Sequence, residues 1–235
     1  MALLEVSGLS AGYGDAVVLR GLELQVEEGE IVAVVGSNGA GKTTLLRALS
    51  GVIPSRGEVR FADRPASSIS PDEAFGRGLV QVPEGRQLFD RMTVEDNLRM
   101  GAFRRRDAAA VRRDFERMYE LFPVLAERRH QLAGSMSGGE QQMCAMARGL
   151  MAAPRLLMVD EMSLGLAPVI VERLLEVLGD IHEQGVTVLM VEQDVNSALS
   201  IAHRGYVLER GEVALTGSAD TLLDDPRVKE AYLGL

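Results

Sequence analysis

A glycine-rich stretch with a single lysine has the spacing of a phosphate-binding loop. It reads G-x-x-x-x-G-K-T and consists of Gly36, Ser37, Asn38, Gly39, Ala40, Gly41, Lys42, Thr43 and Thr44. The glycines let successive backbone N–H groups point toward an anion, and Lys42 reaches the outer phosphates. The hydroxyl of Thr43 is placed to bind Mg²⁺. The stretch therefore predicts a site for phosphates and a divalent cation.

The segments on both sides of this loop fit the same chemistry. Residues 31–35 form an apolar run that predicts a buried parallel strand, and residues 45–50 predict a helix. The N-terminus of that helix adds a partial positive charge beside the loop. A glycine-rich turn with an exposed lysine is the alternative interpretation. It fits less well because both flanking elements are present.

Two carboxylates end a second apolar strand, expected over residues 156–161. Asp160 and Glu161 stand at its carboxyl end, where ligands of open α/β sheets bind. Asp160 is expected to hold Mg²⁺, and Glu161 is placed to orient or deprotonate an attacking water. The alternative is a solvated turn that contains two acids.

Two further features each have a structural and a functional interpretation. One is the segment at the start of a helix predicted over 138–152. It consists of Ser137, Gly138, Gly139, Glu140 and Gln141. Ser137 and Glu140 match a capping box, whereas the two glycines could also leave N–H groups available to an anion. The other is Tyr13, which lies between two glycines and either packs against the fold or stacks on a base.

The remaining pattern predicts the fold class. Residues 3–6, 17–19, 22–26 and 57–61 read as strands of an antiparallel sheet, and residues 92–134 read as a charged helical insert. We predict a single α/β domain over residues 1–235. It has a P-loop NTPase core with a mixed, mainly parallel sheet flanked by helices, an N-terminal antiparallel β-subdomain, and an inserted α-helical subdomain over 92–134. Further expected elements are a helix with a capping box at Ser70, strands over 79–82 and 186–191, a hairpin over 206–213 and a helix over 225–233.

Composition limits the possible partners and the compartment. The net charge of −9 and the pI of about 5.0 argue against a surface for duplex nucleic acid. No apolar run reaches the length of a membrane span, and the N-terminus lacks a signal-peptide pattern. The single cysteine, Cys144, excludes an internal disulfide. We therefore expect a cytoplasmic protein that does not bind nucleic acid.

The order and spacing of these motifs resemble the ATP-binding cassette of ABC transporters. The resemblance covers about residues 3–235 and depends on the phosphate loop, the Ser137–Gln141 segment and the strand that ends in Asp160 and Glu161. Within that family the sequence is similar to the ATPase subunits of branched-chain amino acid importers. The segments that carry this similarity are residues 82–86, 92–98, 164–168, 191–193 and 231–235.

The resemblance implies ATP and Mg²⁺ as cofactors and Tyr13 as the residue that stacks on adenine. It implies that residues 137–141 are a signature segment that closes over the γ-phosphate held by a second cassette, either this chain again or a sister subunit. The loop 163–167 would lie along that interface. The helical insert and the loop around Glu84 would dock on transmembrane permease subunits, and a substrate-binding protein would act indirectly through them. The chain would then be peripheral on the inner face of the cell membrane.

Three positions depart from the family pattern. Glu84 stands where the family usually has a glutamine that senses Mg²⁺, so it is expected near the metal; Gln81, inside the preceding strand, is the poorer candidate by geometry. Gln193 stands where a histidine is usual, and it can hydrogen-bond a γ-phosphate but cannot be a cation. Met162 replaces a proline, with a mild expected effect.

The resemblance predicts an ATPase that powers import of a small solute, with branched-chain amino acids as the expected solute. Its expected catalytic residues are Glu161, Lys42 and Gln193. A regulatory cassette with little hydrolysis is one alternative, which Gln193 favours and Glu161 opposes. A soluble cassette that acts on ribosomes or DNA is another, which the acidic charge opposes.

Overall fold

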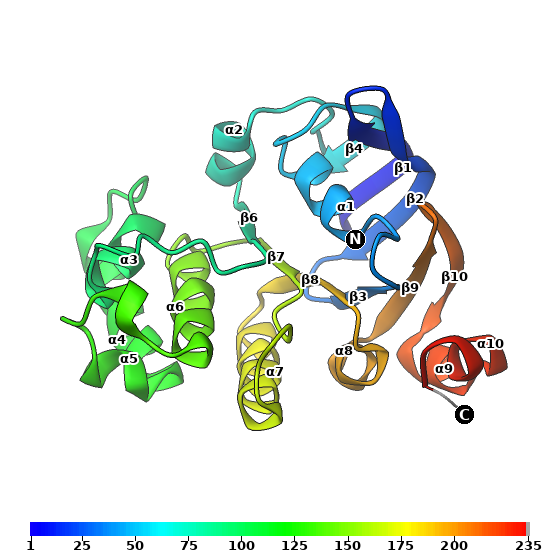
Figure 1. The fold of residues 1–235 in the computed structure, drawn as a ribbon. Helices are drawn as coiled ribbons and strands as arrows, with labels where there is room; N and C mark the ends of the chain where they lie inside the picture. The colour runs from blue at the N-terminus through cyan, green and yellow to red at the C-terminus, as the bar shows by residue number, and fades with distance from the viewer. Residues whose placement is uncertain (234–235) are drawn as a thin grey trace.

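The computed structural model describes residues 1–233, so Gly234 and Leu235 of the predicted ending lie outside the described part (Figure 1). The strands are β1 (Ala2–Tyr13), β2 (Ala16–Glu27), β3 (Ile31–Val35), β4 (Ser55–Phe61), β5 (Arg64–Pro65), β6 (Leu79–Val82), β7 (Leu156–Asp160), β8 (Thr187–Glu192), β9 (Arg204–Glu209) and β10 (Glu212–Ser218). The α-helices are α1 (Lys42–Leu49), α2 (Pro71–Gly76), α3 (Val94–Gly101), α4 (Ala108–Leu121), α5 (Pro123–Glu127), α6 (Gly138–Leu150), α7 (Pro168–Glu183), α8 (Val195–Ile201), α9 (Ala219–Asp224) and α10 (Pro226–Val228). A 3₁₀ turn over Ala133–Ser135 and a π-helical turn over Lys229–Leu233 complete the set.

These strands form two sheets. The larger has the order β10-β9-β3-β8-β7-β6, in which β9 to β6 run parallel and β10 pairs antiparallel with β9. The smaller sheet, β2-β1-β4-β5, is antiparallel. The predicted α/β class, with an N-terminal antiparallel sheet and a mixed, mainly parallel sheet flanked by helices, is confirmed.

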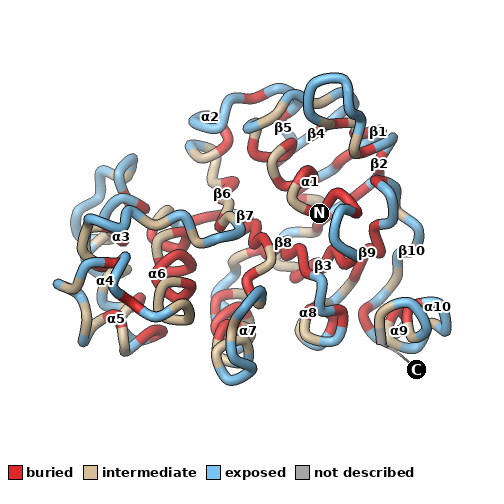
Figure 2. The backbone as a smooth tube through the Cα atoms, in the orientation of Figure 1, coloured by how far each residue is buried: buried red, intermediate tan, exposed pale blue. Residues whose placement is uncertain are grey.

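The larger sheet is buried on both faces because its central strands are apolar throughout. All five residues of β3 are buried, and successive side chains point to opposite faces. Ile31, Ala33 and Val35 join a core under the helices, whereas Val32 and Val34 join a second core with α1 and the smaller sheet. Figure 2 shows these central strands as a continuous buried band.

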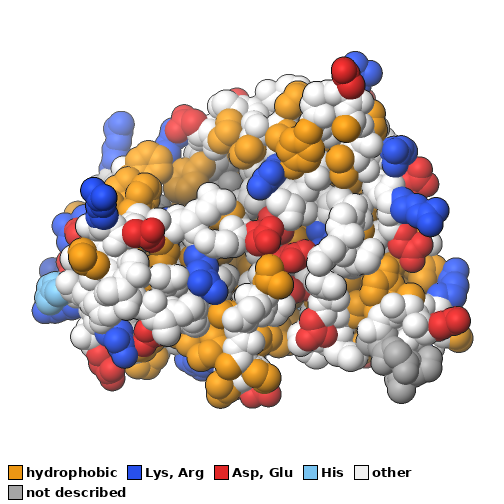
Figure 3. All heavy atoms as spheres, viewed as in Figure 1, with side chains coloured by type: hydrophobic (Ala, Val, Ile, Leu, Met, Phe, Trp, Pro, Cys, Tyr) orange, Lys and Arg blue, Asp and Glu red, His pale blue; other side chains and the backbone are white. Residues whose placement is uncertain are grey.

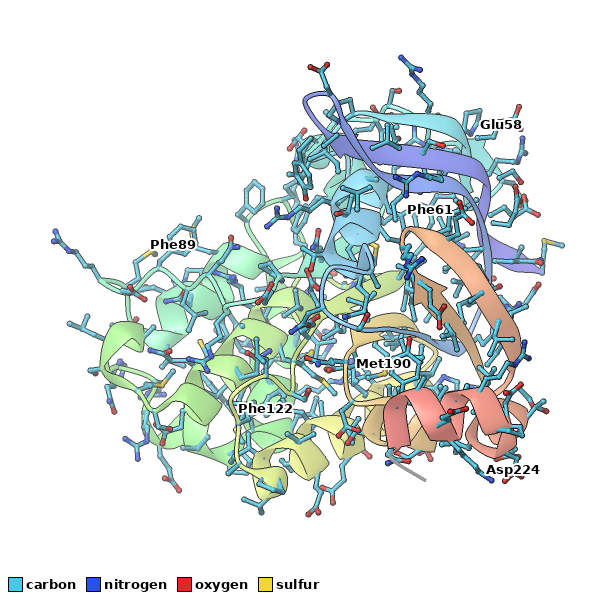
Figure 4. All side chains as sticks on the ribbon, turned by 45° about the vertical axis from the view of Figure 1, so that its right-hand side comes forward. Glu58, Phe61, Phe89, Phe122, Met190 and Asp224 are labelled. Carbon is cyan, nitrogen blue, oxygen red and sulfur yellow. The ribbon has the colours of Figure 1, made fainter. Side chains whose placement is uncertain are left out.

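The two cores lie on opposite sides of the larger sheet. In Figure 4 the labelled Phe61 marks the core of the smaller sheet, and Phe122 marks the core among the helices. Residues 94–135 contain only helices and turns apart from an isolated bridge between Thr93 and Leu132. The helices α3 to α6 thus lie on one side of the larger sheet, and α1 lies on the other (Figure 1).

Several predicted boundaries were wrong. The strand expected at 3–6 and the two expected at 17–19 and 22–26 are two twelve-residue strands, since Gly8 and Gly21 form bulges with positive φ instead of ending them. At Ser70 only half of the capping box forms: its side chain accepts from the Glu73 N–H, while the Glu73 carboxylate pairs with Arg77. Helices α7, α8 and α9 were not predicted. In the part of the chain described here, no helix is long and apolar enough to cross a membrane.

Candidate nucleotide site

The glycine-rich loop connects β3 to α1 and leaves the start of that helix open. A side chain at Gly36 would collide with the carbonyl oxygen of Leu208, so the close approach of the two backbones requires glycine. Gly41 has φ +112° and begins α1 without a side-chain cap. The first turn of α1 contains no acid. In the described part of the chain its first N–H groups therefore have no side-chain acceptor and can donate to an anion.

Lys42 is the buried cation of this loop. Its side chain is 3% exposed, and Nζ donates to the carbonyl oxygens of Gly36 at 2.7 Å and Ser37 at 3.1 Å. Nζ also lies 3.0 Å from Oε1 of Glu161, which follows β7. These contacts join the loop to the end of β7 across 119 residues of sequence, a pairing that the sequence did not predict.

Asp160 and Thr43 form a second contact between the same two segments. Thr43 Oγ1 donates to Asp160 Oδ1 at 3.1 Å, and Asp160 Oδ2 is buried and has no hydrogen-bond partner within residues 1–233. Burial is the main cause that raises the pKa of Asp160 from 3.8 to about 6, and the charges of Glu161 and Glu84 raise it further. A divalent cation fits this unpartnered, charged oxygen.

The protein alone does not supply a full metal coordination shell. Within residues 1–233, no group of three or more His, Cys, Asp and Glu side chains is arranged to hold a metal ion. Mg²⁺ commonly binds one or two carboxylates and takes its other ligands from water and phosphate oxygens. The Thr43 and Asp160 pair therefore fits Mg²⁺ that arrives with a nucleotide.

Glu161 has an unusual backbone conformation. Its φ of +44° is rare for a residue other than glycine, and its N–H donates to the carbonyl of Val191 in β8 at 2.9 Å. Gln193, directly after β8, is exposed and lines the same cleft of about 470 Å³ as Glu161. The structure thus brings the expected base and the residue at the usual histidine position to one cleft.

Tyr13 and Glu84 lie at the edges of this group. The Tyr13 hydroxyl accepts a hydrogen bond at 3.1 Å from Arg47 of α1, so its half-exposed ring lies beside the helix that follows the loop. Glu84 is exposed and makes no ion pair in the described part, although its charge acts on Asp160. Gln81 is engaged elsewhere, since its Oε1 accepts from Ser50 Oγ at 2.9 Å.

The segment Ser137–Gln141 forms the start of α6, away from the loop. Both halves of its capping box are present: Ser137 Oγ accepts from the Glu140 N–H at 3.4 Å, and Glu140 accepts from the Ser137 N–H at 2.8 Å. The capping interpretation is therefore confirmed. No hydrogen bond or ion pair among residues 1–233 joins these five residues to the phosphate loop, to Asp160 or to Glu161.

The loop after β6 contacts the start of α6. Arg86 has φ +66° and donates to Gln141 Oε1 at 3.2 Å, and its guanidinium lies against Gly138. Arg148 of α6 donates to the carbonyl oxygens of Gln87 at 2.7 Å and Arg86 at 3.1 Å. The loop that carries Glu84 is thus fastened to the helix that carries Ser137–Gln141, a link that the sequence spacing did not predict.

Glu192 is a buried acid that received no predicted role. The strand was expected to end at residue 191, but β8 includes Glu192. Its carboxylate accepts from both the N–H and the hydroxyl of Ser163, in the loop after Glu161. The available signal was the likeness of β8 to β7, since both are apolar runs that end in an acid.

Comparison with known proteins gives consistent results. A family model described as "ABC transporter" matches residues 19–163. Over 234 residues the chain is 43% identical to BraG, a high-affinity branched-chain amino acid transport ATP-binding protein of Pseudomonas aeruginosa, covering 99% of this chain and 100% of that protein. It is 32% identical to the lipopolysaccharide export system ATP-binding protein LptB of Acidithiobacillus ferridurans, covering 99% of this chain and 97% of that protein. A crystal structure of the ADP conformation of MJ1267, an ATP-binding cassette of an ABC transporter, matches over the full length of both chains with a TM-score of 0.88 and 25% identity.

Proposed function

This chain belongs to the ABC transporter family, and from that premise we propose that it hydrolyses ATP to drive import of a small solute through separate transmembrane subunits. One observation carries the proposal: four side chains of the two phosphate-site motifs meet at one end of the larger sheet. They are Lys42, Thr43, Asp160 and Glu161, joined by contacts of 3.0 Å and 3.1 Å.

ATP would bind along the loop between β3 and α1. The open N-terminus of α1 and the backbone of residues 36–44 donate to the phosphates, and Lys42 supplies the positive charge. Tyr13 lies beside α1 through its bond to Arg47 and would stack on the adenine. The half-exposed ring leaves one face free for that contact.

Thr43 and Asp160 would hold Mg²⁺ beside the outer phosphates, with Glu84 facing the same ion from the loop after β6. When bound, the ion neutralises charge that develops on the phosphoryl oxygens. Among residues 1–233, Asp160 Oδ2 is buried and has no hydrogen-bond partner, so a cation there would stabilise the ionised carboxylate, whose pKa is raised mainly by burial. ATP and Mg²⁺ are therefore expected to bind together.

Lys42 links nucleotide binding to the release of Glu161. The lysine pairs with Glu161 at 3.0 Å, and the phosphates would replace that partner. The released carboxylate then orients a water and accepts its proton as the water attacks the γ-phosphorus in line. The bond from the γ-phosphorus to the bridging oxygen breaks, which yields ADP and phosphate. Gln193 would hydrogen-bond the γ-phosphate or the water from the other side of the cleft.

A second cassette would complete each site through residues 137–141. In the capping box Ser137 Oγ acts as an acceptor, which leaves its hydroxyl proton free to donate to a γ-phosphate on the second chain. The glycines Gly138 and Gly139 let an anion approach the start of α6 closely. Glu140 and Gln141 hold that start in place by contacts within the same chain. The pair would be head to tail, formed by two copies of this chain or with a sister subunit.

An apolar cleft beside the helical insert would receive a transmembrane subunit. It has a volume of about 350 Å³, and its lining includes Phe75, Phe89, Met100 and Phe103. Phe103 is 63% exposed and stacks on Phe75 at 5.3 Å. Figure 3 shows hydrophobic side chains gathered between the positions of α2 and α3. The insert over 92–134 would thus act as the docking subdomain, which makes the chain a peripheral protein on the cytoplasmic face of the membrane.

Branched-chain amino acids are the proposed solute because BraG is 43% identical over nearly the whole chain. A substrate-binding protein would then deliver the solute to the permease subunits without touching this chain. The second candidate is the ATPase of an export system, which the 32% identity to LptB favours. Nucleic acid is not a proposed partner, given the net charge of −9.

ATP-dependent transport in proteoliposomes distinguishes these candidates. The chain is reconstituted with permease subunits of either type, and uptake of labelled leucine is compared with export of lipopolysaccharide. The expected result is leucine uptake that a Glu161→Gln chain does not support. Stimulation of export alone would replace the import proposal. Nucleotide binding without turnover in either assembly would favour a regulatory cassette.

A further inference from the structure

Glu192 is a buried carboxylate at the end of β8 that none of the steps above uses. Its side chain is 1% exposed, and all six residues of β8 are buried. Burial raises the pKa of Glu192, and a buried carboxylate persists only where hydrogen bonds satisfy it. Ser163 donates to both oxygens: Oε1 accepts from the Ser163 N–H at 3.2 Å, and Oε2 accepts from Ser163 Oγ at 2.7 Å.

Ser163 lies two residues after Glu161, so this contact bears on the expected base. The Glu161 N–H already donates to the carbonyl of Val191 at 2.9 Å, and Met162 between the two is 1% exposed. Residues 161 and 163 are therefore both fastened to the last two residues of β8. The φ of +44° at Glu161 is a conformation that persists only where the surroundings hold it.

Glu192 is also adjacent to the other side of the cleft. Gln193 follows it directly in the chain, and the cleft is lined by Glu161, Ser163, Glu192 and Gln193 together. Glu192 is thus linked to the loop that carries the base by two hydrogen bonds, and to Gln193 by the peptide bond between them. A contact that only stabilised the fold could lie anywhere along β8, whereas the contact between Glu192 and Ser163 lies at the cleft.

We propose that Glu192 is a positioning residue for ATP hydrolysis, whose carboxylate holds Ser163 and thereby keeps Glu161 and Gln193 in a fixed relation across the cleft. This inference rests on the proposed function of the same site. In this proposal the carboxylate acts through Ser163, to which both of its oxygens are hydrogen-bonded. Its loss displaces the base without removing any group that binds ATP.

Two variants and one control test the proposal. Glu192→Gln keeps the shape but removes the charge and replaces one accepting oxygen by an NH₂ group, which cannot accept from the Ser163 hydroxyl. Ser163→Ala removes the hydroxyl bond and keeps the backbone bond. The control is Thr187→Val at the other end of β8, where the buried Thr187 hydroxyl accepts from the Gly29 N–H at 2.9 Å. This control removes a buried hydrogen bond from the same strand far from the cleft.

Hydrogen exchange and steady-state kinetics are measured on each purified chain. In Glu192→Gln we expect amide exchange over residues 161–167 to accelerate about tenfold, while exchange over residues 36–44 is unchanged. We expect kcat to fall about tenfold to a hundredfold with the KM for ATP within about twofold, because a misplaced catalytic group affects turnover more than binding. Ser163→Ala should shift kcat in the same direction by less, and Thr187→Val should leave it unchanged.

The two assays separate this inference from the proposed function. A wild-type chain without turnover above a Glu161→Gln blank would count against the proposed function, and loop exchange would still test the contact between Glu192 and Ser163. Unchanged exchange over residues 161–167 in Glu192→Gln would overturn the inference. So would an unchanged kcat despite faster exchange, or equal losses in all three variants.

Discussion

The helices α1 and α6 begin with similar glycine-rich sequences, but the N-terminus of α1 is uncapped and that of α6 is capped by side chains. Gly41 starts α1 with no side-chain cap and no acid in its first turn. Ser137 starts α6 with a complete capping box, and Glu140 in its first turn also pairs with Arg128 at 2.9 Å. The first helix offers its N–H groups to an anion, whereas the second satisfies part of its own.

This difference explains what each region can do within one chain. The open start of α1 lies next to Lys42, Asp160 and Glu161, so the groups needed to bind ATP are already together. The start of α6 has no such contact in residues 1–233 and lies on the other side of the strands β6 to β8 (Figure 1). We infer that α1 belongs to a site of this chain and that α6 serves the site of another.

The largest expected effect falls on the α1 side. Glu161→Gln should lower ATP turnover about 10²- to 10⁴-fold, because it removes the general base. Its affinity for ATP should be unchanged or tighter, since Lys42 loses a competing partner at 3.0 Å. Steady-state hydrolysis and a fluorescent-nucleotide titration measure the two quantities. Retained turnover would remove Glu161 from the mechanism.

The next effect sharpens the contrast from the α6 side. Gly138→Asp places a carboxylate where a γ-phosphate of the second chain would approach, and Arg86 lies close enough to accommodate it. Turnover should fall about 10²-fold, comparable to the loss of an anion-stabilising donor. ATP affinity of the isolated chain should stay within about twofold. A parallel loss of affinity in the monomer would mean that α6 belongs to the same site as α1.

Lys42→Ala should weaken ATP binding about 10- to 100-fold, the range for lost charge-assisted hydrogen bonds. The chain has two lysines, so Lys229→Ala is the matched control. The ammonium of Lys229 donates to Asp224, and the residue is far from Lys42 in the sequence. Isothermal titration compares the two variants with the wild type. Equal affinities in all three proteins would mean that Lys42 of the phosphate loop does not contribute to nucleotide binding.

The smallest effects concern stability, and they have opposite signs in the two regions. Burial raises the pKa of Asp160 from 3.8 to about 6, so the folded chain keeps a proton that the unfolded chain releases. Stability should therefore fall as pH rises from about 4 through 6, by at most about 3 kcal/mol. Denaturant unfolding at pH 5 and 7.5 measures this slope, and Asp160→Asn should flatten it.

At the start of α6 the sign is reversed. Burial acts to raise the pKa of Glu140, but hydrogen bonds from Ser137 and the charge of Arg128 outweigh it, and the net shift is downward. The stabilisation by Glu140 is present above its unfolded pKa of 4.5 and is lost as pH falls through the lower folded value. Glu140→Gln should thus destabilise the chain at pH 7 and have little effect near pH 3. A constant loss at both values would contradict the capping role.

Local spacing predicted the features that depend on neighbouring residues. The glycine loop, the acids at the end of β7 and the capping box at Ser137 each occupy fewer than ten residues, and the structure has all three. The bulges at Gly8 and Gly21 were misjudged because a glycine between short apolar runs also marks the end of a strand.

Contacts between distant segments were beyond the sequence. The pairing of Lys42 with Glu161 requires β3, β8 and β7 to be neighbours in the sheet, which no local pattern states. Whether Glu192 belongs to β8 was a question of one residue at the end of the strand, and strand ends are the least certain feature of a sequence pattern. The link from Arg86 to Gln141 needs a loop with positive φ at a residue other than glycine, which has no sequence signal.

Mixing two inactive variants tests the central claim most directly. A Lys42→Ala chain keeps its α6 start, and a Gly138→Asp chain keeps its phosphate loop, so a head-to-tail mixed pair contains one complete site. If α1 and α6 of different chains form each site, an equimolar mixture should recover about a quarter of the wild-type turnover. If both helices serve a site within one chain, the mixture will show only the mean of the two inactive variants.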